Sequence, residues 1–199
     1  MDEQRFQEIL DVNRVAIVHF SHHAVMGHRV TFPDDLHHAI SSSESETRSC
    51  CAVCPNLRMD FPGSVGVMFK PKLSQVISVS SSDSGSSDFG GEEGSLGHAP
   101  TEQTILDSLC VPEGGYNEWR VCGAEPIGIF IANPDAILVK KELVMELNDE
   151  MALALGQARI TEIGSIPISL QDVRAAFPSM SVFTMGGEGL ELLPSAAGV

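Results

Sequence analysis

The sequence predicts a single domain of the α+β class, on three observations. Its 199 residues can bury a substantial core but are too few for two ordinary domains. A hydrophobic fraction of 43% with a charged fraction of 20% is typical of globular chains and excludes general disorder. Strand-like and helix-like patterns alternate irregularly along the chain, which favours α+β over a doubly wound parallel sheet.

The N-terminal quarter predicts a helix, a strand and a second helix, in that order. Apolar residues recur at helical spacing over residues 1–13, and residues 14–20 form a nearly continuous apolar, β-rich run typical of a buried strand. A capping-box pattern at 31–34, with proline in the first turn, predicts a helix that continues to Ile40. A polar loop is expected from there to about Arg58.

Two strands are predicted over residues 64–69 and 75–80. The linker Lys70–Lys72 between them is short enough for a tight reversal, so we expect the two strands to pair. Serine and glycine dominate residues 80–100, and this composition has too little apolar surface to offset the entropy of ordering. We therefore expect a mobile loop over this segment.

The C-terminal half predicts helices and strands in mixed order. Residues 101–109 suit a short helix, and residues 118–121 and 127–132 suit two strands with a turn between them. Asn133-Pro134-Asp135 combines a capping side chain, a proline and an acid, so a helix is expected to run from there to about Leu155. The remaining expected elements are a strand at 163–170, a helix near Val173, a strand at 181–185 and a loose end.

Acidic residues outnumber basic residues by 27 to 12, which gives a formal net charge of −15. Such a charge disfavours nucleic acid and anionic membranes as partners, because both are bound mainly through basic side chains. The imbalance is uneven: residues 1–72 hold seven basic and nine acidic residues, whereas residues 73–199 hold five and eighteen. An anionic ligand is therefore expected to bind the first part of the chain.

Cysteine content and the N-terminal residues indicate the compartment. Five cysteines, an odd number, follow a start that is acidic and polar and does not resemble a signal peptide. This favours a reducing compartment, either the cytoplasm or a host cytosol reached by secretion. No apolar run reaches the roughly 18–20 residues needed to span a bilayer, so we expect a soluble protein with no membrane partner.

The most informative motif is Tyr116-Asn-Glu-Trp-Arg-Val121, which places Glu118 at the start of a predicted strand, behind two glycines. It resembles the Tyr-Asn-Glu-Tyr-Ile-Val string that carries the catalytic glutamate of poly-ADP-ribose polymerases, and Ile127–Ile131 is similar to the strand that comes next there. Val18–Ser21 looks like the His-Gly-Ser or His-Tyr-Thr element of ADP-ribosyltransferases, whose histidine holds a ribose hydroxyl of NAD. The order of the two motifs and their separation, about a hundred residues, also suit that family.

The resemblance implies an ADP-ribosyltransferase-like fold, with two packed antiparallel sheets around an NAD cleft and peripheral helices. It also implies transfer of one ADP-ribose from NAD, the co-substrate, to a macromolecular acceptor, with release of nicotinamide. Glu118 would stabilise the oxocarbenium-like ribose electrostatically, and His19 would bond a ribose hydroxyl without adding a permanent charge. The residues expected to contact NAD are His19, Phe20, Ser21, Arg29, Phe69, Ser80 and Tyr116.

The sequence departs from the family pattern at several NAD contacts. Phe20 stands where the polymerases have glycine, and Tyr116 is the only tyrosine, so a phenylalanine would have to stack on nicotinamide. Ser80 follows a strand, as in the Ser-Thr-Ser element of related toxins, although the segment also reads as a simple polar loop. The phenylalanines available are Phe61, Phe69 and Phe89, and the arginines available for the pyrophosphate are Arg29, Arg48 and Arg58.

The acceptor is expected to be a protein, because the acidic charge argues against nucleic acid. The resemblance suggests a monomeric bacterial effector acting in a host cell, with a basic protein such as ubiquitin as one conceivable target. In the arginine-modifying branch a second glutamate lies two residues before the catalytic one, and here that position is Tyr116. We therefore expect Ser, Thr, Asp or Glu, rather than arginine, to be modified.

Three other readings stay open from the sequence. The chain could keep the fold and bind NAD or a partner without turnover. Six histidines within residues 19–38 and three cysteines within 50–54 offer zinc ligands, but their spacing matches no zinc motif, and no metal is expected. Cys54 or Cys122 with one of these histidines would make a protease or deamidase.

Overall fold

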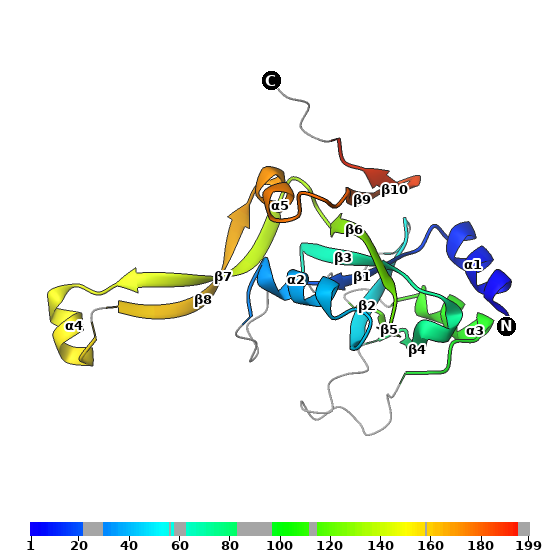
Figure 1. The fold of residues 1–199 in the computed structure, drawn as a ribbon, viewed down its shortest axis with the longest axis horizontal. Coiled ribbons are helices and arrows are strands. Elements are labelled where there is room, and N and C mark those ends of the chain that lie inside the picture. Colours follow the sequence, from blue (N-terminus) through cyan, green and yellow to red (C-terminus); the bar gives the residue numbers. More distant parts are fainter. Residues whose placement is uncertain are drawn as a thin grey trace.

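A computed structural model of the chain describes residues 1–21, 30–55, 57, 63–82, 97–111, 115–157 and 159–194. A large sheet with helices packed against it forms the body, and a two-stranded ribbon projects from it (Figure 1). The helices are α1 (Glu3–Val12), α2 (Asp34–Ser41), α3 (Glu102–Ser108), α4 (Asp149–Leu155) and α5 (Leu170–Ala176), with a short 3₁₀ helix η1 (Leu73–Gln75). The strands are β1 (Ala16–Phe20), β2 (Thr47–Val53), β3 (Val65–Lys70), β4 (Val76–Ser80), β5 (Glu118–Cys122), β6 (Glu125–Ile131), β7 (Ile137–Glu146), β8 (Arg159–Ile168), β9 (Val182–Gly186) and β10 (Gly189–Leu192).

Within the described residues, the large sheet has eight strands in the order β10-β9-β6-β3-β1-β2-β5-β4, and β7 and β8 form a separate two-stranded sheet. Neighbours in the large sheet are antiparallel except β6 and β9, which are parallel. The predicted α+β class is therefore confirmed. The expected two packed antiparallel sheets are absent from the described structure, which has one mixed sheet and a two-stranded ribbon. The large sheet is mixed because the chain returns through α5 and β9 then lies parallel to β6.

Each face of the sheet buries its own apolar cluster. The larger cluster joins Ile17 and Trp119 to side chains of α1, α2, α3 and α5, so we call this side the helix face. The smaller cluster, on the opposite face, contains Val18, Phe20 and residues of β2, β3 and β6. Successive residues of β1 thus enter different clusters, as the alternation of a strand between two buried faces requires.

Many predicted elements are present with boundaries shifted by a few residues. The predictions for α1, β1, α3, β5, β6, α5 and β9 are confirmed. The helix predicted after residue 31 is α2, but its expected capping box is absent: Pro33 is the N-cap and makes no side-chain hydrogen bond there. Residues 83–96 of the expected mobile loop lie outside the described residues. No helix within the described ranges is long and apolar enough to cross a membrane.

The polar loop predicted over residues 41–58 is wrong, because this segment contains β2. Its first half, Thr47–Ser49, is polar and carries no alternation that would mark a strand. The strand forms because β1 and β5 supply backbone partners on its two sides. These partners lie far from β2 in sequence and leave no local signal.

The predicted pairing of β3 with β4 is also wrong. β3 lies between β1 and β6, whereas β4 pairs with β5 at the end of the strand order and makes an isolated antiparallel bridge with His98 on its other side. The linker between them is not a tight reversal. Through η1 the chain passes from β3, inside the sheet, to β4, at the end of the strand order. Three strands, β1, β2 and β5, therefore separate β3 from β4.

The long helix predicted from residue 133 is replaced by β7 up to Glu146, and only α4 is helical. Apolar residues recur there every three or four positions, but Ile137 and Val139 enter the core with the two-residue period of a strand. All ten residues of β7 pair with β8, which a local pattern does not reveal. The C-terminal segment expected to be loose contains β10.

Candidate functional site

Glu118 is a buried carboxylate at the first position of β5, with 6% of its surface exposed. The residue before it, Asn117, bonds the backbone N–H and carbonyl of Ala52 at 2.8 and 2.9 Å, and the Ser108 carbonyl at 2.9 Å. The residue after it, Trp119, donates from Nε1 to Ser108 Oγ at 2.9 Å. Both neighbours are fully buried. The backbone of Glu118 is therefore held from both sides.

The register shows where Glu118 points. Trp119 belongs to the cluster of the helix face, so strand alternation directs Glu118 to the opposite face. There it is the cross-strand partner of Ser80 in β4, which is also buried. Phe20 and Tyr116 belong to or pack against the cluster of the same face. Four of the predicted site residues thus share this side of the sheet.

His19 has the other orientation. Because Val18 and Phe20 enter the cluster of the opposite face, His19 points toward the helix face, and its Nδ1 donates to the Ser49 carbonyl at 2.7 Å. Ser21 is also on this side, where its hydroxyl donates to Asp35 of α2. Phe69 is buried in the core cluster of the helix face. The structure therefore does not bring His19 and Glu118 together on one face.

The pairing of β1 with β2 stops part-way along the two strands, and we call this place the split. Registered pairs between these strands end at Val18 and Cys51; beyond this point His19 and Phe20 pair with β3, while residues 47–50 of β2 pair with β5. A cavity of about 360 Å³ lies on the helix face beside the split. Its lining residues are His19, Phe20, Val30, Asp35, His38, Ala39, Arg48, Ser49 and Lys140.

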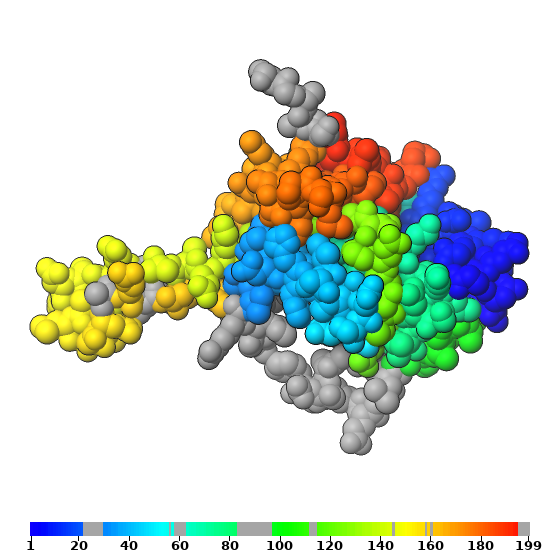
Figure 2. Space-filling view, in the orientation of Figure 1, coloured from blue at the N-terminus to red at the C-terminus, as the bar shows by residue number. Residues whose placement is uncertain are grey.

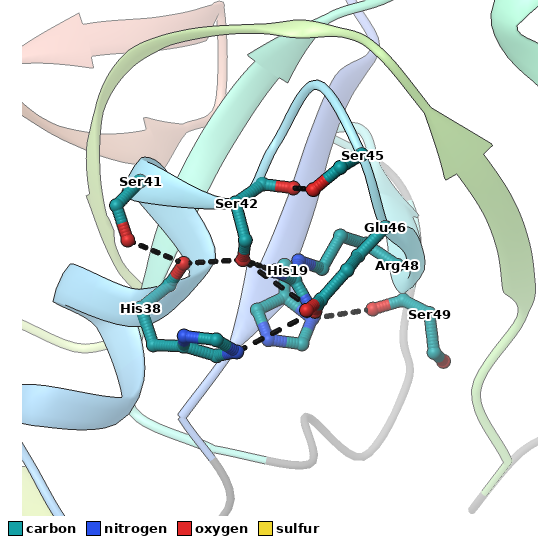
Figure 3. A network of polar contacts seen from close by, with 8 residues as sticks. All are labelled: His19, His38, Ser41, Ser42, Ser45, Glu46, Arg48 and Ser49. Atoms are coloured by element: carbon teal, nitrogen blue, oxygen red, sulfur yellow. Dashed lines mark hydrogen bonds and ion pairs between the residues drawn. The ribbon is translucent and has the colours of Figure 1, made fainter.

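A polar network surrounds one wall of this cavity (Figure 3). Arg48 Nη1 lies 2.6 Å from Glu46 Oε2, and its Nη2 donates to Ser42 Oγ. His38 Nε2 lies 3.4 Å from the same carboxylate oxygen. The hydrogen bond from Arg48 lowers the pKa of Glu46 below its ordinary value. Arg48 Nε is buried and makes no hydrogen bond within the described part of the protein.

The cavity brings positive charge to one place in an acidic chain. Arg48 comes from β2 and the buried Lys140 from β7, and two imidazoles lie beside them. Asp35 and Glu46 offset part of this charge. The surroundings suit an anionic group; Arg48 lies in the first part of the sequence and Lys140 in the second, and binding of an anion to the first part stays a prediction.

Several predicted site residues fall outside the described residues. Arg29, Arg58, Phe61 and Phe89 are among them, as are His22, His23 and His28 of the histidine-rich segment. Among the residues that the structure does describe, no group of three or more His, Cys, Asp or Glu side chains is placed to hold a metal ion.

The cysteines differ widely in exposure. Cys50 and Cys51 are buried, Cys54 and Cys122 are partly buried, and Cys110 is exposed. Burial raises the pKa of the Cys50 thiol well above its ordinary value, and the neighbouring Cys51 adds to this effect. This direction is opposite to the one that activates a cysteine nucleophile.

Sequence reasoning did not identify Asp35, Ser49 or Lys140 as site residues. Lys140 fell within a segment that predicted a helix, and Ser49 within a predicted loop, so neither position pointed to a cavity. His38 was visible only as one of many possible metal ligands. Comparisons of this chain with protein-family models, with curated proteins and with solved structures find no match.

Proposed function

We propose that this chain is a mono-ADP-ribosyltransferase that moves ADP-ribose from NAD to a side chain of a protein acceptor. The observation that carries the proposal is Glu118, a buried carboxylate fixed by Asn117 and Trp119 within the motif that resembles the polymerases. Most glutamates are solvated surface residues, so a buried carboxylate at this position of the motif supports the proposal.

The chemistry uses Glu118 as an electrostatic stabiliser. The bond between nicotinamide and C1′ of the ribose breaks, and its electron pair leaves with nicotinamide. Positive charge then develops on C1′ and the ring oxygen, and a fixed carboxylate in a site with little water stabilises that charge most strongly. An oxygen of the acceptor side chain attacks C1′ and forms the new glycosidic bond. A serine or threonine hydroxyl releases its proton to solvent in this step, whereas an aspartate or glutamate carboxylate attacks without a proton to lose.

The rest of NAD is proposed to lie across the split between β1 and β2. Cys50 of β2 lies opposite Trp119 of β5, at the first position where β2 no longer pairs with β1. Glu118 is next to Trp119 in β5, so it lies one residue from the start of the split. The pyrophosphate would bind Arg48 and Lys140 in the cavity, and His19 would contact a ribose hydroxyl at the end of β1. This path links the two faces on which the predicted contacts lie.

The decisive experiment measures nicotinamide release and transfer of label from NAD to proteins of a cell lysate. Glu118→Gln keeps the shape of the side chain but removes its charge, so we expect it to lower turnover about a hundredfold or more with unchanged folding. Glu125→Gln, at the exposed first position of β6, is the matched control and should leave turnover unchanged. Near wild-type turnover by Glu118→Gln would exclude the catalytic role.

A second variant tests the NAD path separately. His19→Ala should chiefly raise KM for NAD, because the proposed contact exists in the bound substrate as well as in the transition state. His98→Ala, with an exposed side chain, is its control. An unchanged KM for His19→Ala would reject the path through the split and leave the Glu118 role standing. Binding of NAD with no nicotinamide release would instead indicate a non-catalytic binding module.

A further inference from the structure

The β7–β8 ribbon is a long arm whose base is anchored and whose end projects from the body (Figure 2). At the base, Ile137 and Val139 are buried in the core, and the Phe32 N–H donates to the Lys140 carbonyl at 3.1 Å. Beyond the pair Lys141 and Gly164 the ribbon continues to α4. We call the distal part, residues 142–162, the arm tip.

The arm tip is a formed structure. Asn148 caps α4 by accepting a hydrogen bond from the Met151 N–H at 2.9 Å, and Gly156, with φ of 66°, ends the helix in the left-handed conformation. No residue of α4 is buried. A seven-residue helix and a two-stranded ribbon are each only marginally stable in water. Covering them with another surface would stabilise both.

Large apolar side chains are exposed on the arm tip. Their exposed fractions are 37% for Leu143, 57% for Val144, 47% for Met151, 87% for Leu153 and 57% for Leu155. Such a concentration of exposed apolar groups on one projection is typical of an interaction surface. The sequence did not predict this surface, because Leu143 and Met151 fit the apolar stripe of a predicted helix.

Acidic side chains accompany these apolar groups. Between residues 142 and 162 the acids are Glu142, Glu146, Asp149, Glu150 and Glu162, and the only basic residue in that stretch of sequence is Arg159. A second copy of the chain would bring an equally acidic tip and a net charge of −15 toward the first, so like charges oppose self-association through this surface. An anionic membrane is opposed for the same reason.

We infer that the arm tip is a docking surface for a protein that presents an apolar patch bordered by lysine and arginine side chains. The apolar patch would cover Leu153, and the basic border would face Asp149 and Glu150, which lie four and three residues before Leu153 and therefore share its side of α4. Complementary charge would speed association and fix orientation, while the apolar contact supplies most of the affinity. This inference does not depend on the proposed catalytic function.

The test uses a synthetic amphipathic helical peptide with a leucine face bordered by lysines, and its counterpart with every lysine replaced by glutamate. Fluorescence anisotropy with the full chain should show binding of the lysine peptide and much weaker binding of the glutamate peptide. Leu153→Ser should weaken binding of the lysine peptide about tenfold or more, through loss of buried apolar contact. Asp149→Lys/Glu150→Lys should weaken it similarly and flatten its dependence on salt.

Matched controls lie on the body of the protein. Val12→Ser removes an apolar side chain of α1 that is 80% exposed, and Asp11→Lys/Glu191→Lys makes the same change of net charge away from the arm. The inference is overturned if the lysine peptide does not bind, if the glutamate peptide binds as well, or if the controls weaken binding as much as the arm variants do. It is also overturned if sedimentation shows a dimer that Leu153→Ser dissociates, because the occupant is then a second copy.

Discussion

Asn117 pairs with Ala52 through both atoms of its side-chain amide. Its Oδ1 accepts the Ala52 N–H at 2.8 Å, and its Nδ2 donates to the Ala52 carbonyl at 2.9 Å, so the side chain acts as a strand partner for this residue of β2. A third bond, from Nδ2 to the Ser108 carbonyl at 2.9 Å, ties the same amide to the end of α3. One buried side chain therefore connects β2, α3 and the start of β5, immediately before Glu118.

Asn117→Asp should destabilise the protein by about 3 kcal/mol, because a carboxylate has no N–H for the Ala52 and Ser108 carbonyls and places a charge in a buried site. Urea unfolding followed by circular dichroism would measure the change. Asn133→Asp, at an exposed turn where the side chain only accepts a hydrogen bond, is the control and should change stability by less than about 0.5 kcal/mol. Equal effects of the two changes would contradict the role assigned to Asn117.

The cysteines should react with a thiol reagent in order of exposure. Cys110 is exposed and should be modified first, whereas Cys50 is buried with a raised pKa and should react only after unfolding. Mass spectrometry of the native protein at successive times of labelling would give the order. Labelling of Cys54 or Cys122 before Cys110 in the native protein would indicate an activated thiol. It would then favour the alternative function as a protease or deamidase.

Arg48 should set the acid titration of Glu46. Because the Arg48 hydrogen bond lowers the pKa of Glu46 in the folded protein, this pair contributes stability above the ordinary carboxyl pKa of 4.5 and loses it as pH falls through the lowered folded value. Arg48→Gln should move the pKa of Glu46 up toward 4.5 and reduce the acid loss of stability that this pair causes. Carboxyl chemical shifts followed by NMR from pH 7 to pH 2.5 would test both statements.

Arg174→Gln is the control for this titration, because Arg174 bonds backbone carbonyls near the C-terminal end and does not touch Glu46. It should leave the Glu46 curve unchanged. An unshifted curve for Arg48→Gln would show that the pair is not formed in solution.

The sequence predicted local elements better than their partners. α1 and β5 have strong patterns of their own, whereas β2 and β7 are strands only because other strands, distant in sequence, pair with them. The same limit applies to the site. The motif identified Glu118. The orientation of His19 toward the other face follows from the alternation of side chains along β1, which the motif does not show. The cavity forms from residues of α2, β2 and β7 that share no motif.

The modified residue, if the proposed transfer occurs, should not be arginine. A guanidinium is too basic to act as a nucleophile unaided, and the arginine-modifying branch of ADP-ribosyltransferases, unlike the polymerases that this motif resembles, places a second glutamate two residues before the catalytic one. Here that position is Tyr116, which is partly buried against the cluster of the opposite face; a tyrosine hydroxyl offers a hydrogen bond but no negative charge at neutral pH. We therefore expect adducts on Ser, Thr, Asp or Glu, mapped by fragmentation mass spectrometry of labelled acceptors.

Tyr116→Glu should raise the share of arginine adducts, while Tyr116→Phe should not. A wild-type enzyme that modifies mainly arginine would contradict this assignment of Tyr116.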